Sequence, residues 1–273
     1  MFVSTAVASG QHPSIRPAAE PPVDTQATAE TSPTAIAVIL GSSQTHLWVA
    51  GRGGVSCPSS ETAGTHAAVR RGRVADGSGC VGVLTQLTRQ HRDPIPADPV
   101  VVVCRPVLAT MAEQYALRRV ATAVFAPSRV LFIDTVRAAA IGAGAATGGL
   151  LIADIGAELS EVAVLQDGRV AAARRTDLGT RDLKRGTPTE VLAQATTRMV
   201  GELRRDPAAP ALVPAALTRG LMVVGDGAMT PSLMSQIATD LRVLVRSAAA
   251  PWTAALNGAG LAAMAAARHP AIR

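Results

Sequence analysis

The stretch LLIADIGAELSEVAVLQDGRV, residues 150–170, decides the fold class of this chain. A first apolar run ends at Asp154-Ile155-Gly156, a second follows, and Asp167-Gly168 is typical of a two-residue hairpin turn. An Asp at the end of an apolar strand, followed by a Gly, is an arrangement that phosphate and metal sites use. The segment therefore predicts a three-stranded unit with a candidate binding turn between its first two strands.

The same pattern occurs earlier in the chain, as an internal repeat. IAVILGSSQTHLWVAGRGGV (36–55) aligns without a gap with LIADIGAELSEVAVLQDGRV (151–170), and Gly41 falls on Gly156. Each unit predicts three strands and is followed by helical segments. Two such units indicate a duplicated α/β fold with a cleft between its halves.

Between and after the repeats, short apolar runs alternate with helical patterns, as they do in parallel α/β folds. Thr110 and Glu113 have the spacing of a capping box, which predicts a helix from there to about Phe125. The other expected strands lie at 100–104, 129–134, 220–227 and 241–247, and the other expected helices at 78–92, 136–144, 189–205, 231–241 and 252–268.

Length and composition limit the class of protein. The 273 residues are 48% hydrophobic and 17% charged, which suffices for one large domain or two modest ones. No apolar run is long enough to span a bilayer and no signal-peptide pattern is present, so a cytoplasmic protein is expected. Residues 1–35 are rich in Pro, Ala and Thr and predict a disordered tail. The expected halves are 36–148 and 149–273, and the C-terminal helix could pack back on the first half.

The net charge of +6 favours nucleic-acid binding at first sight. Nearly all of the positive charge is arginine, however, and aromatic residues make up 2% of the chain, too few for a base-stacking surface. Nucleic-acid binding is therefore a minor alternative. The positions expected to be solvated are the carboxylates Glu158 and Glu161 and a run of arginines, Arg169, Arg174, Arg175, Arg181 and Arg185.

From about Ile36 to Ala267 the chain resembles the MreB family of bacterial shape-determining proteins, in the actin-like ATPase superfamily. The segments that carry the resemblance are VVVCRP with the following helix, IDTVRAAAIGAG, DIGAELSEVAV and RGLMVVGDGAMTPSL, in the order and approximate spacing of the family. The resemblance implies two RNase-H-like halves around a cleft that binds ATP and magnesium. It also implies polymerisation beneath the cell membrane to organise wall synthesis.

The first phosphate loop of the family reads like D-L-G-T-A-N-T, and here it is Ile39-Leu-Gly-Ser-Ser-Gln-Thr45. Ile39 replaces the Asp that helps hold magnesium, and an isoleucine has no oxygen to offer a metal. The resemblance places Gly41, Ser42 and Ser43 beside the phosphates.

The second loop, D-I-G-G-G-T-T-E in the family, keeps Asp154, which the resemblance makes the remaining magnesium-side carboxylate, and Gly156. Ala157 adds a Cβ where backbone should approach phosphate, Glu158 introduces a like charge, and Leu159 removes a hydroxyl. Asp154 equally fits a purely structural role in capping its own turn.

The remaining family positions are also altered. Thr135 stands in the place of the carboxylate that positions the attacking water, with Asp134 one residue earlier, and a threonine is no general base near neutral pH. The adenosine loop, G-G-G in the family, is Gly225-Asp226-Gly227. The short connections between Pro58 and Arg71 and between Asp177 and Thr189 predict that the family's outer subdomains are reduced or missing, which would leave a shallow cleft.

The expected function is therefore that of a non-catalytic, pseudo-ATPase scaffold or filament-associated partner in cell-shape or cell-wall assembly. ATP and magnesium are expected to bind weakly or not at all. The expected partners are full-length MreB-like filaments or the wall-synthesis machinery, and any membrane association would run through them. A residual ATP-binding switch or weak ATPase that polymerises is the alternative, and an arginine-rich nucleic-acid binder the weaker one.

Overall fold

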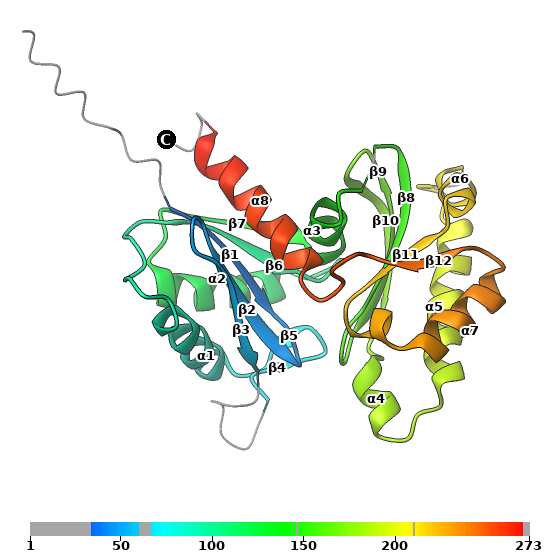
Figure 1. Ribbon diagram of the computed structural model, residues 1–273, viewed down its shortest axis with the longest axis horizontal. Coiled ribbons are helices and arrows are strands. Elements are labelled where there is room, and N and C mark those ends of the chain that lie inside the picture. The colour runs from blue at the N-terminus through cyan, green and yellow to red at the C-terminus, as the bar shows by residue number, and fades with distance from the viewer. Residues whose placement is uncertain (1–33, 60–66, 146, 210, 270–273) are drawn as a thin grey trace, which may run out of the picture. The chain divides into compact units, whose positions relative to one another are not determined.

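Two five-stranded sheets with matching strand orders form the framework of the protein (Figure 1). The first has the order β3-β2-β1-β6-β7 and the second β10-β9-β8-β11-β12. Each is an antiparallel three-stranded meander extended by two parallel strands. The first sheet contains β1 (Ala35–Leu40), β2 (Gln44–Val49), β3 (Gly53–Pro58), β6 (Val100–Arg105) and β7 (Arg129–Asp134). The second contains β8 (Gly149–Ile155), β9 (Ser160–Gln166), β10 (Arg169–Thr176), β11 (Leu221–Val224) and β12 (Val245–Ser247).

The predicted duplicated α/β fold is confirmed by this arrangement, because the first three strands of each sheet come from the two sequence repeats. The computed structural model describes residues 34–59, 67–145, 147–209 and 211–269, and all of them belong to one unit. The predicted tail lies outside the described residues except for positions 34 and 35, and so do residues 60–66 of the first short connection. We call the described residues before and after position 146 the first and second halves.

The apolar run of β6 is continuous because helices cover both faces of its sheet. Val101 and Val103 belong to a core with α1 (Gly77–Arg89) and α2 (Met111–Phe125). Val100 and Val102 belong to a second core with α8 (Ala254–Arg268). The last helix of the chain thus packs on the first sheet.

Helix α2 begins with the capping box that the sequence predicts. The Glu113 amide donates to Thr110 Oγ1 over 3.2 Å, and the Thr110 amide donates to Glu113 Oε2 over 2.6 Å. This pairing satisfies two backbone donors at the helix start and fixes the direction of the Glu113 side chain.

The second sheet is covered in the same way. One face packs on α5 (Thr189–Arg204), α6 (Leu212–Thr218) and α7 (Pro231–Leu241), and the other on α3 (Thr135–Gly142). Five short elements are absent from the sequence prediction, the two strands β4 (Val69–Arg70) and β5 (Arg73–Val74) of one hairpin, helices α4 (Thr180–Lys184) and α6, and the 3-10 helix η1 (Asp226–Met229). They are too short for a periodic pattern, and Pro214 interrupts α6.

Helices α3 and α8 cross with their backbones in contact. A Cβ atom at Gly142 would overlap the carbonyl of Ala254, and one at Gly258 would overlap the carbonyl of Ala138. Only glycine fits at either position, so this crossing fixes a close approach between helices attached to different sheets. None of the helices in the described residues is long and apolar enough to cross a membrane.

Candidate functional site

A cavity of about 790 Å³ lies where the turn between β1 and β2 faces the turn between β8 and β9. Its volume is in the range of small-molecule sites. The cavity is lined by most of the residues that the sequence singles out, Gly41, Ser42, Ser43, Thr135, Asp154, Gly156, Gly225 and Asp226. Asp134 and Gly227 are not among the lining residues.

The first turn is a closed backbone structure without a carboxylate. The Gly41 amide donates to the Gln44 carbonyl over 3.0 Å, and Ser59 donates from its hydroxyl to the Gly41 carbonyl and from its amide to the Ser43 carbonyl. Ile39 lines the cavity beside this turn. The turn therefore keeps its shape through contacts with the end of β3, and it offers no anionic ligand to a metal.

The second turn carries a row of charged residues across three strands. In the strand register Asp154 of β8 is opposite Glu161 of β9, which is opposite Arg175 of β10. Burial and the nearby Asp226 carboxylate raise the pKa of Asp154 to about 6. A carboxyl with that pKa is partly protonated near neutral pH, which weakens it as a cation ligand.

Glu161 is buried, so the prediction that it is solvated is wrong. Its side chain accepts a hydrogen bond from the Val107 amide over 2.6 Å, because the loop after β6 covers this end of the second sheet. Burial and the charge of Asp154 raise the pKa of Glu161 well above its ordinary value. This carboxyl is a structural contact between the two halves.

Glu158 is also buried, with 7% of the residue surface exposed, so the prediction that it is solvated is wrong as well. It accepts from the Arg71 amide over 3.1 Å and forms an ion pair with Arg181 at 2.7 Å. Burial raises the pKa of Glu158, but the Arg71 amide and the Arg181 guanidinium outweigh it and hold the pKa below its ordinary value. The carboxylate therefore stays ionised inside the turn.

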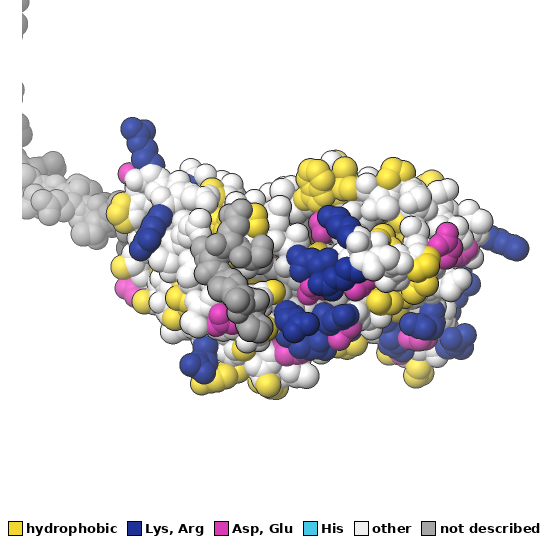
Figure 2. Space-filling view, turned by 90° about the horizontal axis from the view of Figure 1, so that it is seen from below, with side chains coloured by type: hydrophobic (Ala, Val, Ile, Leu, Met, Phe, Trp, Pro, Cys, Tyr) yellow, Lys and Arg dark blue, Asp and Glu magenta, His cyan; other side chains and the backbone are white. Residues whose placement is uncertain are grey.

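Arg181 also joins the two turns. One guanidinium nitrogen binds Glu158, and the other donates to the Ser42 carbonyl of the first turn over 3.1 Å. The predicted solvated arginine face is thus wrong for Arg181, and it is wrong for Arg174 and Arg175, which pair with Asp206 and Glu113. Figure 2 shows Lys and Arg side chains on this face lying among Asp and Glu side chains.

Both candidates for positioning a water are engaged in other contacts. Asp134 forms an ion pair with Arg105 at 3.0 Å, and the Thr135 hydroxyl donates to the Arg105 carbonyl over 3.0 Å. Arg105 is the last residue of β6, so these contacts tie the neighbouring strands β6 and β7 together. Neither side chain is left to act as a base toward the cavity.

Packing requires both glycines of the predicted adenosine loop. Gly225 has a positive φ of 76°, and a Cβ there would lie 2.5 Å from Asp154 Oδ1. A Cβ at Gly227 would lie 2.5 Å from the Ile155 side chain. Burial raises the pKa of Asp226 against the opposing charge of Lys184. This turn therefore owes its glycines to its contact with the end of β8.

A magnesium ion does not fit the residues present. The described parts of the chain contain no group of three or more His, Cys, Asp or Glu side chains that could hold a metal ion. Asp154 and Ile39 both line the cavity, Ile39 offers no oxygen ligand, and the raised pKa of Asp154 disfavours the charged form that Mg²⁺ needs. In the second turn, the Glu158 carboxylate would repel a phosphate placed beside it.

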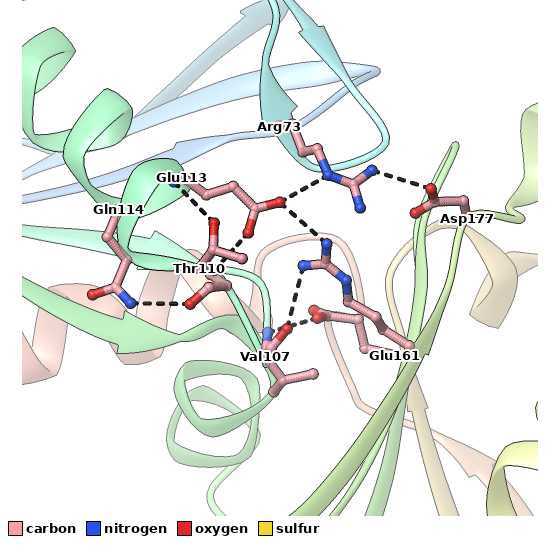
Figure 3. Close-up of polar contacts among 9 residues, drawn as sticks. Arg73, Val107, Thr110, Glu113, Gln114, Glu161 and Asp177 are labelled. Atoms are coloured by element: carbon pink, nitrogen blue, oxygen red, sulfur yellow. Dashed lines mark hydrogen bonds and ion pairs between the residues drawn. The ribbon is translucent and has the colours of Figure 1, made fainter.

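Four residues that make polar contacts beside the cavity are absent from the predicted site, Arg71, Arg73, Glu113 and Asp177. Figure 3 shows Arg73, Glu113 and Asp177. Arg71 and Arg73 belong to the β4–β5 hairpin and Asp177 follows β10. The capping box locates Glu113, but nothing local indicates that the same carboxylate accepts from two arginines.

Known proteins resemble this chain in sequence and in fold. Residues 63–185 match the MreB/Mbl protein family. MreB5 of Spiroplasma citri bound to AMPPNP has a TM-score of 0.73 and 18% identity, over 84% of this chain and 96% of that chain. The MamK double helical filament has a TM-score of 0.71 and 14% identity, over 85% and 98%. The ethanolamine utilization protein EutJ from Carboxydothermus hydrogenoformans has a TM-score of 0.58 and 18% identity, over 84% and 89%.

No curated protein matches the sequence significantly. The structural matches are below 25% identity and establish the fold, while the family match adds the MreB/Mbl signature over residues 63–185, which include the second turn. Over residues 63–185 the chain is therefore similar to the MreB/Mbl family, and its described residues have the actin-like fold that MreB5 and MamK share.

Proposed function

We propose that the chain is a non-catalytic scaffold or filament-associated subunit, active in cell-shape or cell-wall assembly alongside full-length MreB-like filaments. The observation that carries this proposal is the buried Glu158 carboxylate, paired with Arg181 between the two turns. The nucleotide-bound relative is MreB5 of Spiroplasma citri, solved with AMPPNP and with ADP, and the filamentous one is MamK. This chain keeps their fold and has lost the chemistry of the cleft.

Hydrolysis lacks each of its chemical requirements. Ile39 supplies no metal ligand, Glu158 would repel a phosphate at short range, and Thr135 is bound to the Arg105 carbonyl. An ordered phosphate chain also needs backbone amides that approach it closely, which the Cβ of Ala157 hinders. Each change alone would weaken turnover, and together they favour a protein-binding role in the cytoplasm.

Calorimetry with MgATP and the full chain tests the loss of nucleotide binding. We expect no measurable heat of binding at millimolar ATP, where a Kd of 1 mM corresponds to about −4 kcal/mol, because Ile39 offers no metal ligand and Glu158 opposes a polyphosphate. Asp154→Ala is the control. A Kd well below the millimolar level that disappears in Asp154→Ala would instead establish a live nucleotide site.

Co-sedimentation with filaments of a full-length MreB-like protein tests the scaffold role. We expect the chain to pellet with assembled filaments and to stay in the supernatant when the filaments are depolymerised. The matched control is the EutJ-type relative, which shares the fold. Absence of co-sedimentation at micromolar concentrations of both proteins would rule out filament association.

A residual ATP-responsive switch is the second candidate, and the cavity of about 790 Å³ favours it. It would use Asp154 for magnesium, Gly41 with Ser42 and Ser43 for phosphate, and Gly225 with Gly227 for adenosine. Phosphate release that is lost in Asp154→Ala would support it. Nucleic-acid binding is less favoured, because the arginines Arg174, Arg175 and Arg181 are already paired with carboxylates.

A further inference from the structure

Ion pairs and hydrogen bonds join the two halves across the cavity. We propose that this cross-cleft network holds the halves closed without nucleotide, and that Glu158 acts as a built-in anion between the two turns. The network consists of Arg71, Arg73, Glu113, Glu158, Arg175, Asp177 and Arg181, with the Ser42 carbonyl. The inference goes beyond the scaffold role, since it concerns the conformation of the chain and holds whether or not a filament partner is found.

The β4–β5 hairpin brings the first half to the second turn. Its tip has two residues with positive φ, Arg71 at 48° and Gly72 at 72°, in a tight two-residue turn. A Cβ at Gly72 would lie 2.7 Å from the Leu159 side chain, so the tip packs directly on the turn. From this tip the Arg71 amide donates to Glu158 and its guanidinium to the Asp177 carbonyl.

Glu113 is the second point of attachment (Figure 3). The same carboxylate oxygen accepts from Arg73 of its own half over 2.8 Å and from Arg175 of the second half over 3.2 Å. Arg73 reaches on to Asp177 at 3.1 Å, so charges alternate in sign across the boundary. Burial raises the pKa of Glu113, but the Thr110 amide and the Arg175 guanidinium lower it to about 2, so the Glu113 carboxylate stays charged well into the acidic range.

Arg181 and Glu158 are the third point, and they lie between the two turns. The guanidinium binds Glu158 in the second turn and the Ser42 carbonyl in the first. A phosphate chain held between two such turns would connect them in the same way, with anionic oxygens facing donors on both sides. Here one carboxylate and one guanidinium of the chain itself provide that connection.

The contacts differ in burial, which ranks their contributions. The Arg73 and Asp177 side chains are 42% and 43% exposed, so this pair contributes little. The Glu158 and Glu113 side chains are only 9% and 15% exposed. Removing the arginine partner of either carboxylate would leave a desolvated charge. Glu158–Arg181 and Glu113–Arg175 should therefore dominate closure.

Native cysteines provide the test. Cys104 lines the cavity at the margin of the core between the first sheet and α8, whereas Cys80 lies in the core between the first sheet and α1, away from the cavity lining. In the full chain under native conditions, we would measure the iodoacetamide alkylation rate of each thiol by peptide mass mapping. We expect Arg181→Gln to raise the rate at Cys104 about tenfold, equivalent to about 1.4 kcal/mol of opening free energy, and to leave Cys80 unchanged.

The matched control is Arg174→Gln, which breaks the 2.9 Å pair between Arg174 and Asp206 inside the second half. It should leave both rates unchanged. The double variant Glu158→Gln/Arg181→Gln should react at Cys104 no faster than about the faster single variant, because both changes remove one interaction.

Three results would overturn the inference. Equal acceleration of alkylation at Cys104 and Cys80 would mean global unfolding. Equal effects of Arg181→Gln and Arg174→Gln on the Cys104 rate would mean that a contact between the halves protects this thiol no more than a contact within one half. Protection of Cys104 in the unaltered chain by MgATP would mean that nucleotide, and not the network, closes the cleft. Only this last result would also contradict the scaffold proposal, so the two can fail separately.

Discussion

The two turns that face each other across the cavity have changed in opposite ways. In the first, Ile39 stands where a carboxylate would be, and the backbone is held by Ser59 at the end of β3. In the second, Asp154 remains and Glu158 has been added together with arginine partners. Under the proposed loss of nucleotide binding, the first turn lacks a functional group and the second carries protein contacts in place of a ligand.

The two turns also share a feature that keeps each of them folded without a ligand. The hydrogen bond from the glycine amide is nearly the same in both, 3.0 Å from Gly41 and 2.9 Å from Gly156. The turn geometry therefore depends on local backbone pairing and on nearby protein groups. Ligand chemistry can be removed without unfolding it, so the corresponding positions of the repeat can be compared directly by mutation.

The largest difference in the effect of substitution on stability is expected between Asp154 and Ile39, its counterpart in the repeat. The folded pKa of Asp154, about 6, lies above the ordinary 3.8, so the folded state binds the proton more tightly. The stability contributed by this group is present below about pH 4 and is lost as pH rises through 6. We expect Asp154→Asn to stabilise the protein by about 2–3 kcal/mol at pH 7 and by little at pH 4, measured by urea unfolding.

Ile39→Val provides the comparison, and its small destabilisation should not depend on pH. If Asp154→Asn instead destabilises the protein equally at both pH values, the carboxyl is held by favourable contacts, and the structural role of capping its turn would be the better interpretation.

The second-largest difference in the free energy of unfolding is expected between variants at Glu158 and Ser43, which are aligned in the repeat. Glu158→Ala leaves the Arg71 amide and Arg181 without their acceptor and should lower the free energy of unfolding by about 1–2 kcal/mol. Ser43→Ala should change it by less than about 0.5 kcal/mol. Thermal unfolding of both variants at neutral pH decides this, and equal values would deny Glu158 a structural role.

A smaller difference is expected between the aligned glycines. A Cβ at Gly41 would lie 2.6 Å from the Gln44 carbonyl oxygen, but one at Gly156 would lie 3.2 Å from the Leu159 carbonyl oxygen. We expect Gly41→Ala to destabilise the protein by about 1 kcal/mol and Gly156→Ala by about half of that. The reverse order in chemical denaturation would show that the second turn is the tighter one.

The smallest expected effect is that of restoring the first carboxylate alone. Ile39→Asp should produce no measurable MgATP binding in calorimetry, because Glu158 still occupies the second turn. The comparison variant is Ile39→Asp/Glu158→Gly. Weak MgATP binding in this double variant, but not in Ile39→Asp, would mean that the native Ile39 and Glu158 both prevent binding. Binding in Ile39→Asp by itself would mean that Glu158 is no obstacle.

Most of the fold could be predicted from the sequence because its signals are local. Alternation, the capping box at Thr110 and Glu113, and the repeat itself specify strands, helix starts and turns within a few residues. The candidate site could be predicted only as a position. Glu158 accepts from Arg71, 87 residues earlier, and the burial of Glu161 depends on Val107, 54 residues earlier. No local pattern shows that a carboxylate in a hairpin meets a partner at that distance in the chain.

The glycine contact between α3 and α8 has a mechanical consequence. Figure 1 shows this crossing and the β4–β5 hairpin at opposite ends of the boundary between the two sheets. Because the two backbones touch at Gly142 and Gly258, this crossing limits sliding between the two helices, and the Arg71 contact of the hairpin joins the two sheets at a second, separate place. A rotation about either place therefore has to break the contacts at the other.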